Sequence, residues 1–252
     1  MKLRQDFFIG VQDVDQNKRI TNHALLEMLS DISMLHGVKA GQTSTEGRST
    51  VSWIVLGWRV KVYKRPSMFS TVSVYTWAQQ HGHVRANRDY LVCDENGEKI
   101  AEATAEWTPI DTRTGRFLRI TPDLIGAFEP EPEEVNFPEY KLPVVRRFSM
   151  EPDITKQIEL NTSMFDYNRH IHNSIYLVLA EQILPEEAFQ DEINEFELVY
   201  KMEITENQPV LLEYKREENT HTVAIRSAQG GTLHAVVFLK NGEEERGANN
   251  TR

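Results

Sequence analysis

The sequence predicts an α+β fold built from two similar halves, and three observations lead to this prediction. A segment with four prolines and five glutamates, residues 128–143, divides the chain near its middle. A short polar element at residues 15–22 returns at residues 166–173, each time directly before an apolar segment with helical spacing. Strand-like segments follow the helical segment in both halves. We therefore expect one helix and a four-stranded antiparallel sheet, occurring twice.

The helix of the first half is predicted from apolar residues at helical spacing, and Gly37 offers a stop. The helix of the second half, residues 175–180, is apolar on every side and must therefore be enclosed. The strands are expected at 51–63, 71–77, 84–93, 100–109, 196–204, 210–215, 222–227 and 232–240. A sheet that curls around a buried helix is the hotdog arrangement. We predict a double hotdog, with tandem domains at 1–127 and 144–252 joined by a linker at 128–143.

Composition and charge narrow the function classes. Of the 252 residues, 40% are hydrophobic and 26% are charged, as in ordinary globular proteins. The lone Cys93 excludes an internal disulfide and a cysteine-based zinc site. The first 125 residues hold 16 basic and 14 acidic residues, and the remaining 127 hold 12 and 24, which argues against a nucleic-acid partner. We expect a cytoplasmic protein without a metal or a cofactor.

The repeated element holds the densest polar cluster of the chain. Residues 15–22, DQNKRITN, and residues 166–173, DYNRHIHN, are identical at four of eight positions. The last asparagine of each, Asn22 and Asn173, is expected to cap the following helix. Where the second half has His170, the first has Arg19, which cannot act as a base near neutral pH. If one half is catalytic, it is the second.

Asp166, Asn168 and His170 supply the parts for acyl transfer to water. A helix N-terminus presents free backbone N–H groups that can stabilise an oxyanion. An imidazole can move protons near neutral pH, and a carboxamide can bind a carbonyl oxygen. The alternative is that the three residues only form a loop and a cap. A metal site at His170 and His172 lacks a third ligand.

These residues resemble the acyl-acyl carrier protein thioesterases of plants and bacteria. The resemblance covers roughly residues 5 to 240 and includes Trp58-Arg-Val-Lys-Val62, Arg88-Asp-Tyr-Leu-Val92, the element at 166–173 and Tyr200-Lys-Met-Glu203. It implies that fatty acyl chains are hydrolysed from acyl carrier protein. It also implies a first domain that shapes the acyl pocket, and the catalytic residues Asp166, Asn168, His170 and Glu203.

Two observations at Glu203 differ from what the resemblance implies. The plant pattern has a cysteine after this glutamate, where this chain has Ile204, so a thiol route is not available and we expect direct attack by water. Strand alternation over 196–204 places Glu203 on the face that carries Glu197, and this pattern alone predicts a solvent-facing side chain unless a bulge turns it.

Other readings of the sequence remain open. A thioesterase for coenzyme A esters would use the same chemistry. A hotdog dehydratase or hydratase typically has Asp-x-Asn-Pro-x-His, whereas Arg169 follows Asn168 here. Because acyl carrier proteins are acidic, we expect them to dock on basic residues of the first half, such as Arg59, Lys61 and Arg65 on one strand face.

Overall fold

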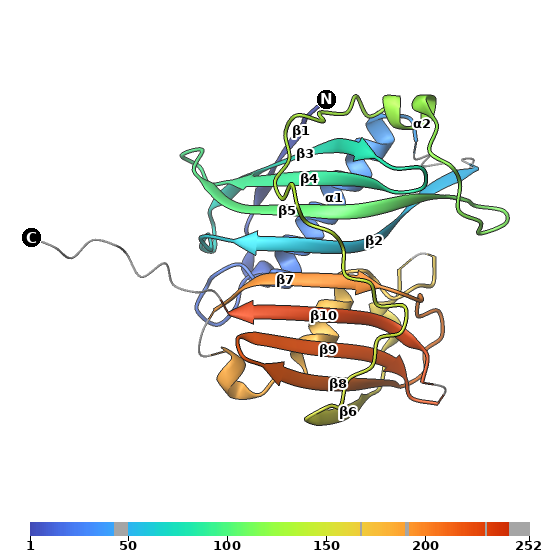
Figure 1. The fold of residues 1–252 in the computed structure, drawn as a ribbon. Coiled ribbons are helices and arrows are strands. Elements are labelled where there is room, and N and C mark those ends of the chain that lie inside the picture. Colours follow the sequence, from blue (N-terminus) through green and yellow to red (C-terminus); the bar gives the residue numbers. More distant parts are fainter. Residues whose placement is uncertain (43–49, 167, 190–191, 230, 242–252) are drawn as a thin grey trace, which may run out of the picture.

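The computed structural model describes residues 1–42, 50–166, 168–189, 192–229 and 231–241. Across these residues the strands form one ten-stranded antiparallel sheet in the order β1-β3-β4-β5-β2-β7-β10-β9-β8-β6 (Figure 1). The strands of the first half are β1 Leu3–Phe8, β2 Val51–Val62, β3 Thr71–His81, β4 Ala86–Cys93 and β5 Lys99–Asp111. Those of the second half are β6 Ile154–Ile158, β7 Ile193–Tyr200, β8 Val210–Glu217, β9 Thr220–Ser227 and β10 Leu233–Asn241.

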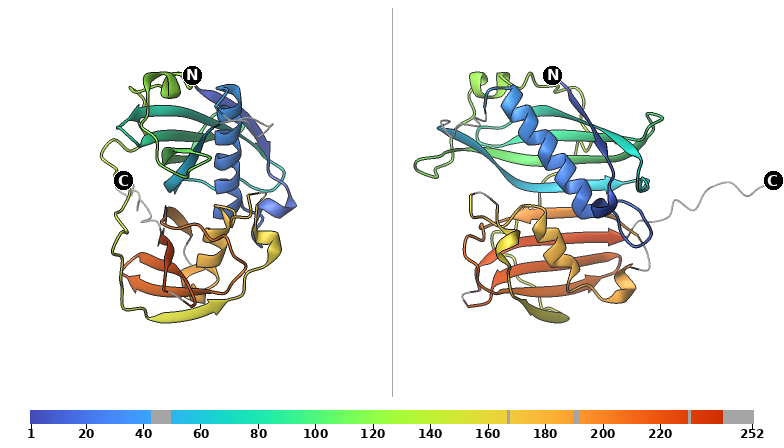
Figure 2. Two further views of the ribbon diagram at one scale, coloured as in Figure 1. Left: turned by 90° about the vertical axis from the view of Figure 1, so that its right-hand side faces the viewer. Right: turned by 180° about the vertical axis from the view of Figure 1, so that it is seen from behind.

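The two long helical segments, α1 (Asn22–Lys39) and α3 (Ile175–Glu181), lie on the same face of the sheet (Figure 2). A short helix, α2 (Pro122–Gly126), and the 3-10 turns Val11–Asp13, Thr162–Met164 and Glu186–Phe189 complete the described elements. Apolar side chains of both halves meet in one cluster, in which Leu26 of α1, Trp58 of β2, Leu177 of α3 and Phe196 of β7 are fully buried. Among the described residues, no helix is long and apolar enough to span a bilayer.

The edge strands β1 and β6 and the short helix α2 are absent from the sequence expectation. β6 is exposed along nearly its whole length, so it lacks the apolar alternation that identifies a strand. α1 also runs past Gly37 to Lys39, and Gly41, with φ of 67°, follows its end. Asn96-Gly97 forms the expected turn between β4 and β5, with Gly97 at φ of 79°.

The two halves share the sheet through β2 and β7. In this seam Arg59 lies opposite Glu197, and Lys61 lies opposite Glu195. The Arg59 guanidinium binds Glu195 across the seam at 2.9 Å. Each of these two cations of β2 thus lies opposite a carboxylate of the second half, and Arg59 forms an ion pair there. The prediction that Arg59 belongs to a free docking surface is wrong.

Residues 128–143, which we call the strap, cross the outer face of the sheet, opposite the helices (Figure 1). The strap contains turns but neither helix nor strand, as its prolines predict, and side chains of the sheet fix it. Trp77 Nε1 donates to the Glu134 carbonyl at 2.8 Å, and the Asn136 backbone N–H donates to Asp89 at 2.8 Å. Arg59 lies over the ring of Phe137, with 4.6 Å between the guanidinium carbon and the ring centroid. The strap therefore packs on the sheet along its length.

Candidate functional site

The loop before α3 is closed by Asp166. Its Oδ1 atom accepts hydrogen bonds from the backbone N–H groups of Asn168 at 2.8 Å and His170 at 3.0 Å. The backbone N–H of Asp166 in turn donates to the His170 carbonyl at 2.8 Å. Arg169 between them has φ of 63°, a strained value for a residue with a side chain. Asp166 thus fixes the positions of Asn168 and His170 through their backbone.

The matching loop of the first half has the same geometry. Asp15 Oδ1 accepts from the backbone N–H groups of Asn17 at 2.8 Å and Arg19 at 3.0 Å. The Asp15 N–H donates to the Arg19 carbonyl at 2.9 Å, and Lys18 has φ of 60°. The repeat seen in the sequence is therefore a repeat in three dimensions. The shared aspartate shapes the loop in both halves, and the chemistry can differ only through the side chains that the loop presents.

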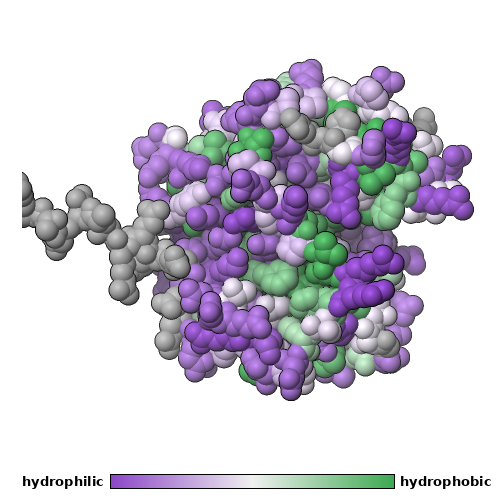
Figure 3. Space-filling view, viewed as in Figure 1, coloured by the Kyte–Doolittle hydropathy of each residue, from purple (hydrophilic) through white to green (hydrophobic). Residues whose placement is uncertain are grey.

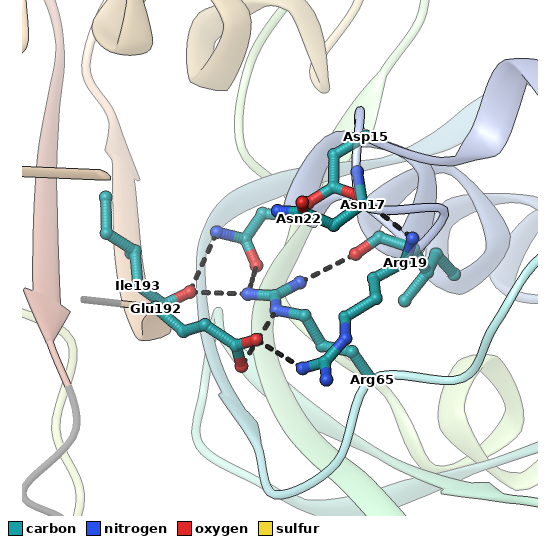
Figure 4. Close-up of polar contacts among 8 residues, drawn as sticks. Asp15, Asn17, Arg19, Asn22, Arg65, Glu192 and Ile193 are labelled. Carbon is teal, nitrogen blue, oxygen red and sulfur yellow. Dashed lines mark hydrogen bonds and ion pairs between the residues drawn. The ribbon is translucent and has the colours of Figure 1, made fainter. Parts of the chain in front are cut away.

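The first-half loop is used to hold the two halves together (Figure 4). Arg19 forms an ion pair with Glu192 at 2.5 Å. Arg65, only 8% exposed at its side chain, donates to the Ile193 carbonyl at 2.5 Å and to Asn22 Oδ1 at 2.7 Å. Asn22 Nδ2 also donates to the Ile193 carbonyl, at 3.1 Å. Arg65 therefore lies inside this contact, and the prediction that it belongs to a docking surface is wrong.

The expected caps at Asn22 and Asn173 are also wrong. Thr21 caps α1, where its Oγ1 accepts from the Ala24 N–H at 3.1 Å. Asn22 is the first helical residue, and its amide is turned to Ile193. In the second half α3 begins at Ile175, so Asn173 lies outside it, and its carbonyl accepts from the Tyr200 hydroxyl at 2.8 Å.

Glu203 lies beyond the end of β7, because the strand stops at Tyr200. The next two backbone N–H groups, of Lys201 and Met202, both donate to the carbonyl of His234, at 2.8 and 3.1 Å. Two residues then share one partner, so the strict alternation of the strand is lost. The expected strand over 196–204 is therefore wrong at its end, and a bulged segment directs Glu203.

This arrangement brings Glu203 to His170. Glu203 Oε2 lies 3.6 Å from His170 Nδ1, and the carboxylate side chain is 57% exposed. The glutamate is thus largely exposed, as strand alternation predicts, and it also lies near the histidine. A separation of 3.6 Å is longer than a hydrogen bond, as is common for catalytic pairs without substrate. The two groups can share a proton through a small movement or one water molecule.

The Glu203 segment is held on three sides. The Ile171 N–H donates to the Ile204 carbonyl at 3.0 Å, and the Ile204 N–H donates to the Tyr176 hydroxyl at 3.3 Å. His234 Nδ1 donates to the Met202 carbonyl at 3.0 Å. His234 is the extra residue of a β-bulge in β10, since its neighbours pair with consecutive residues of β9. Sequence reasoning missed Tyr176 and His234, which sit in apolar strands and helices like ordinary core residues.

Asn168 lies on the wall of a pocket of about 280 Å³. The other lining residues come from the first half, chiefly from α1, β2, β4 and the region of α2, and from Phe128 at the start of the strap. The apolar ones include Met34, Trp53, Trp107 and Ile125. The volume is close to the lower end of ligand-binding cavities. The first half therefore forms the pocket, and the second half contributes the loop with the candidate catalytic residues.

A buried basic pair lies beside this pocket. Arg88, one of the lining residues, donates to His36 Nδ1 at 2.7 Å. Burial, followed by the charge of Arg88, lowers the pKa of His36 to about 3. His36 is therefore neutral at physiological pH, and its Nδ1 lone pair is free to accept the bond. Within the part of the chain that the structure describes, no carboxylate forms an ion pair with Arg88, and His36 is one of its hydrogen-bond partners.

Two carboxylates of α1 face the second-half loop, and the sequence offered no signal for them because they lie on the polar side of a helix. Glu27 accepts from the Ser174 hydroxyl at 3.3 Å, and Ser174 is in turn 3.3 Å from His172 Nδ1. Partial burial, and then the nearby Glu27, raise the pKa of Asp31, while His172 opposes the shift. Among the described residues, no group of three or more His, Cys, Asp and Glu side chains could hold a metal ion.

Comparisons with known proteins agree with this architecture. Residues 1–128 match the family model described as the acyl-ACP thioesterase N-terminal domain. The chain is 23% identical to the chloroplastic oleoyl-acyl carrier protein thioesterase of Coriandrum sativum over 95% of its own length and 73% of the relative.

Two solved structures share the whole architecture. An acyl-ACP thioesterase from Bacteroides thetaiotaomicron superposes with a TM-score of 0.83 at 21% identity, covering 95% of this chain and 97% of the other. The 12:0-ACP thioesterase of Umbellularia californica gives 0.79 at 21% identity, with 95% and 96% covered. The predicted double hotdog fold is confirmed.

Proposed function

This chain belongs to the acyl-ACP thioesterase family, and on that premise we propose that it hydrolyses the thioester of fatty acyl-acyl carrier protein. The products are a free fatty acid and the carrier protein with its thiol. As a thioester hydrolase, the enzyme needs a pocket for the chain, a group that activates water and a donor for the carbonyl oxygen. The described residues supply a candidate for each of these parts.

The observation that carries the proposal is the approach of His170 to Glu203 beside the pocket that Asn168 lines. The acyl chain would lie in the first-half pocket, which places the thioester carbonyl near the second-half loop. The pair of His170 and Glu203 then takes a proton from water, and the water oxygen attacks the carbonyl carbon. The Asn168 amide donates to the carbonyl oxygen as it becomes an oxyanion.

The tetrahedral intermediate collapses when the carbon–sulfur bond breaks. The proton taken from water returns to the sulfur, so that the carrier leaves as a thiol. No covalent acyl-enzyme is required. Ile204 follows Glu203, and the free Cys93 is buried in β4, away from the loop. Asp166 contributes by holding the loop, since its carboxylate is engaged with two backbone N–H groups.

The test is the release of free acid from carrier-bound acyl chains of different lengths, with the matching coenzyme A esters as comparison. We expect kcat/KM to be higher for the carrier-bound substrates. Glu203→Gln keeps the shape of the side chain and removes its basicity, so kcat should fall roughly a hundredfold. If the purified protein released acid only from coenzyme A esters, the carrier would not be its substrate. We also propose a cytoplasmic setting, which the single free cysteine supports.

A further inference from the structure

A turn rich in arginine projects beside the pocket. Residues 111–120, which we call the arginine hairpin, contain three arginines and one aspartate in a chain of net charge −10. Arg113, Arg116 and Arg119 are all exposed. Arg113 lies 3.6 Å from Asp111, whereas Arg116 and Arg119 have no carboxylate within ion-pair distance among the residues that the structure describes. Two cations of the hairpin are therefore available to a partner.

The hairpin is a defined structure, which keeps these cations in place. Asp111 Oδ1 accepts from the backbone N–H groups of Arg113 and Thr114, both at 2.9 Å. The Asp111 N–H donates to the Arg116 carbonyl at 2.9 Å, and Gly115 takes φ of 67° to close the turn. These bonds lower the pKa of Asp111, first of all the one from the Thr114 N–H, so its carboxylate stays ionised as a fixed acceptor.

The position of the hairpin relates it to the candidate catalytic loop. Thr112, inside the hairpin, and Asn168, inside the loop, line the same pocket. The β2 start, the hairpin and the segment after β7 lie at one end of the molecule, which faces the viewer in the left panel of Figure 2. A carrier docked on the hairpin would therefore hold its acyl thioester at the pocket that the substrate must enter.

Exposed apolar groups accompany the arginines, as in interfaces that combine charge with contact area. Phe117 is 65% exposed, and Val84, in the turn between β3 and β4, is 43% exposed. The Ile120 N–H donates to the His83 carbonyl at 2.8 Å, which ties the two turns together. Figure 3 shows hydrophilic groups that project from the right-hand edge of the first half, with hydrophobic groups beside them.

We propose that the arginine hairpin, with Phe117 and Val84, is the surface on which the acidic acyl carrier protein docks. This inference rests on the proposed function. It differs from the expectation for β2, where Arg59 and Arg65 are already bound to the second half and Lys61 alone of the three is exposed. Charges at the rim of an interface act mainly on association and on its salt dependence. The hairpin should therefore govern KM for the carrier-bound substrate and leave the chemical step alone.

The test compares charge reversals of equal size in two places. Arg116→Glu with Arg119→Glu should raise KM for acyl-carrier protein about tenfold at low ionic strength, with kcat nearly unchanged. Hydrolysis of an acyl-pantetheine thioester, which lacks the carrier, should stay as in the wild type. The control is Arg146→Glu with Arg147→Glu, exposed residues that follow the strap next to Val145, which packs on Val236 of β10. This control should leave KM for both substrates unchanged.

Two further pairs of substitutions distinguish the loss of positive charge from the added repulsion. Arg116→Lys with Arg119→Lys should keep KM near the wild-type value, and the effect of the reversal should shrink as salt rises. Arg116→Gln with Arg119→Gln removes the charge without adding repulsion and should give a smaller rise in KM. An unchanged KM in the reversed variant, or an equal rise in the control, would overturn the docking proposal. Failure of the wild type to cleave carrier-bound thioesters would instead refute the proposed function.

Discussion

The backbone N–H of Ile171 donates to the carbonyl of Ile204 across 3.0 Å, and this bond joins the segments that carry His170 and Glu203. Each of the two isoleucines directly follows one member of the pair in sequence. Both isoleucine side chains are buried, so apolar packing fixes the two anchor points. The pair is therefore positioned by the backbone and the core, while its own side chains remain open to solvent and substrate.

The repeat offers a matched test of His170. His170→Ala should lower kcat roughly a hundredfold or more and leave the fold intact, because a general acid/base is lost. Arg19→Ala changes the equivalent position of the first half and removes only an exposed ion pair with Glu192, so kcat should stay within about twofold. Initial rates with acyl-carrier protein and thermal melts decide the outcome. Near-normal turnover of the folded His170→Ala protein would remove the histidine from the mechanism.

The two loop aspartates should separate structure from chemistry. Asp166→Ala and Asp15→Ala each leave two backbone N–H groups without their carboxylate, so each should cost about 1–2 kcal/mol of unfolding free energy. Only Asp166→Ala should also lower kcat, since only that loop presents His170. Chemical denaturation and steady-state kinetics of the two variants provide the comparison. Equal loss of kcat in both would show that the loss comes from stability alone.

His234 is expected to position Glu203 without touching substrate. His234→Leu removes the donor to the Met202 carbonyl, so Glu203 should shift and kcat should fall roughly tenfold or more. His234→Asn places an amide donor near the position of Nδ1 and should restore most of kcat, with KM unchanged in both variants. The pH–rate profile of His234→Leu should change if the pair is disturbed. Equal kcat in the leucine and asparagine variants would exclude the positioning role.

Asp89 beneath the strap should make stability depend on pH. The side chain is 1% exposed, and burial raises the pKa of its carboxyl to about 6, although bonds from Thr104 and Asn136 oppose the shift. Because the folded state holds this proton more tightly than the unfolded chain, stability falls as pH rises from about 4 to about 6. The change attributable to Asp89 is about 3 kcal/mol.

The measurement for Asp89 is the unfolding free energy of wild type and Asp89→Asn between pH 4 and pH 7. Asparagine keeps the acceptor for the Asn136 N–H and carries no charge. The unfolding free energy of the variant should therefore increase relative to that of the wild type as pH rises through this window. Taking the difference at each pH cancels groups common to both proteins, including His36, whose lowered pKa has the opposite effect. A difference that does not vary with pH would contradict the assignment.

Periodicity and the internal repeat were enough to predict the fold, because the two helices and eight of the strands carry clear apolar patterns. The edge strands β1 and β6 lacked that pattern. Near the candidate site, Arg19 at the position equivalent to His170 predicts that the halves differ, and the structure places Arg19 at Glu192 and His170 near Glu203. The position of Glu203 depends on a bulge at His234, a residue of another strand. Alternation within the segment of Glu203 therefore cannot predict it. The position of the β2 cations at the seam likewise could not be predicted from β2 alone, because it depends on the pairing of β2 with β7.

The two loops also show what joining the halves in one polypeptide makes possible. In an assembly of two identical chains, a substitution in one loop appears in both, so every copy must serve the same purpose. In a single polypeptide the two loops are encoded separately, so their side chains can differ. Arg19 of the first loop pairs with Glu192, whereas His170 of the second lies near Glu203. The aspartate-dependent turn is the same in both loops, so the difference between them lies in the side chains alone.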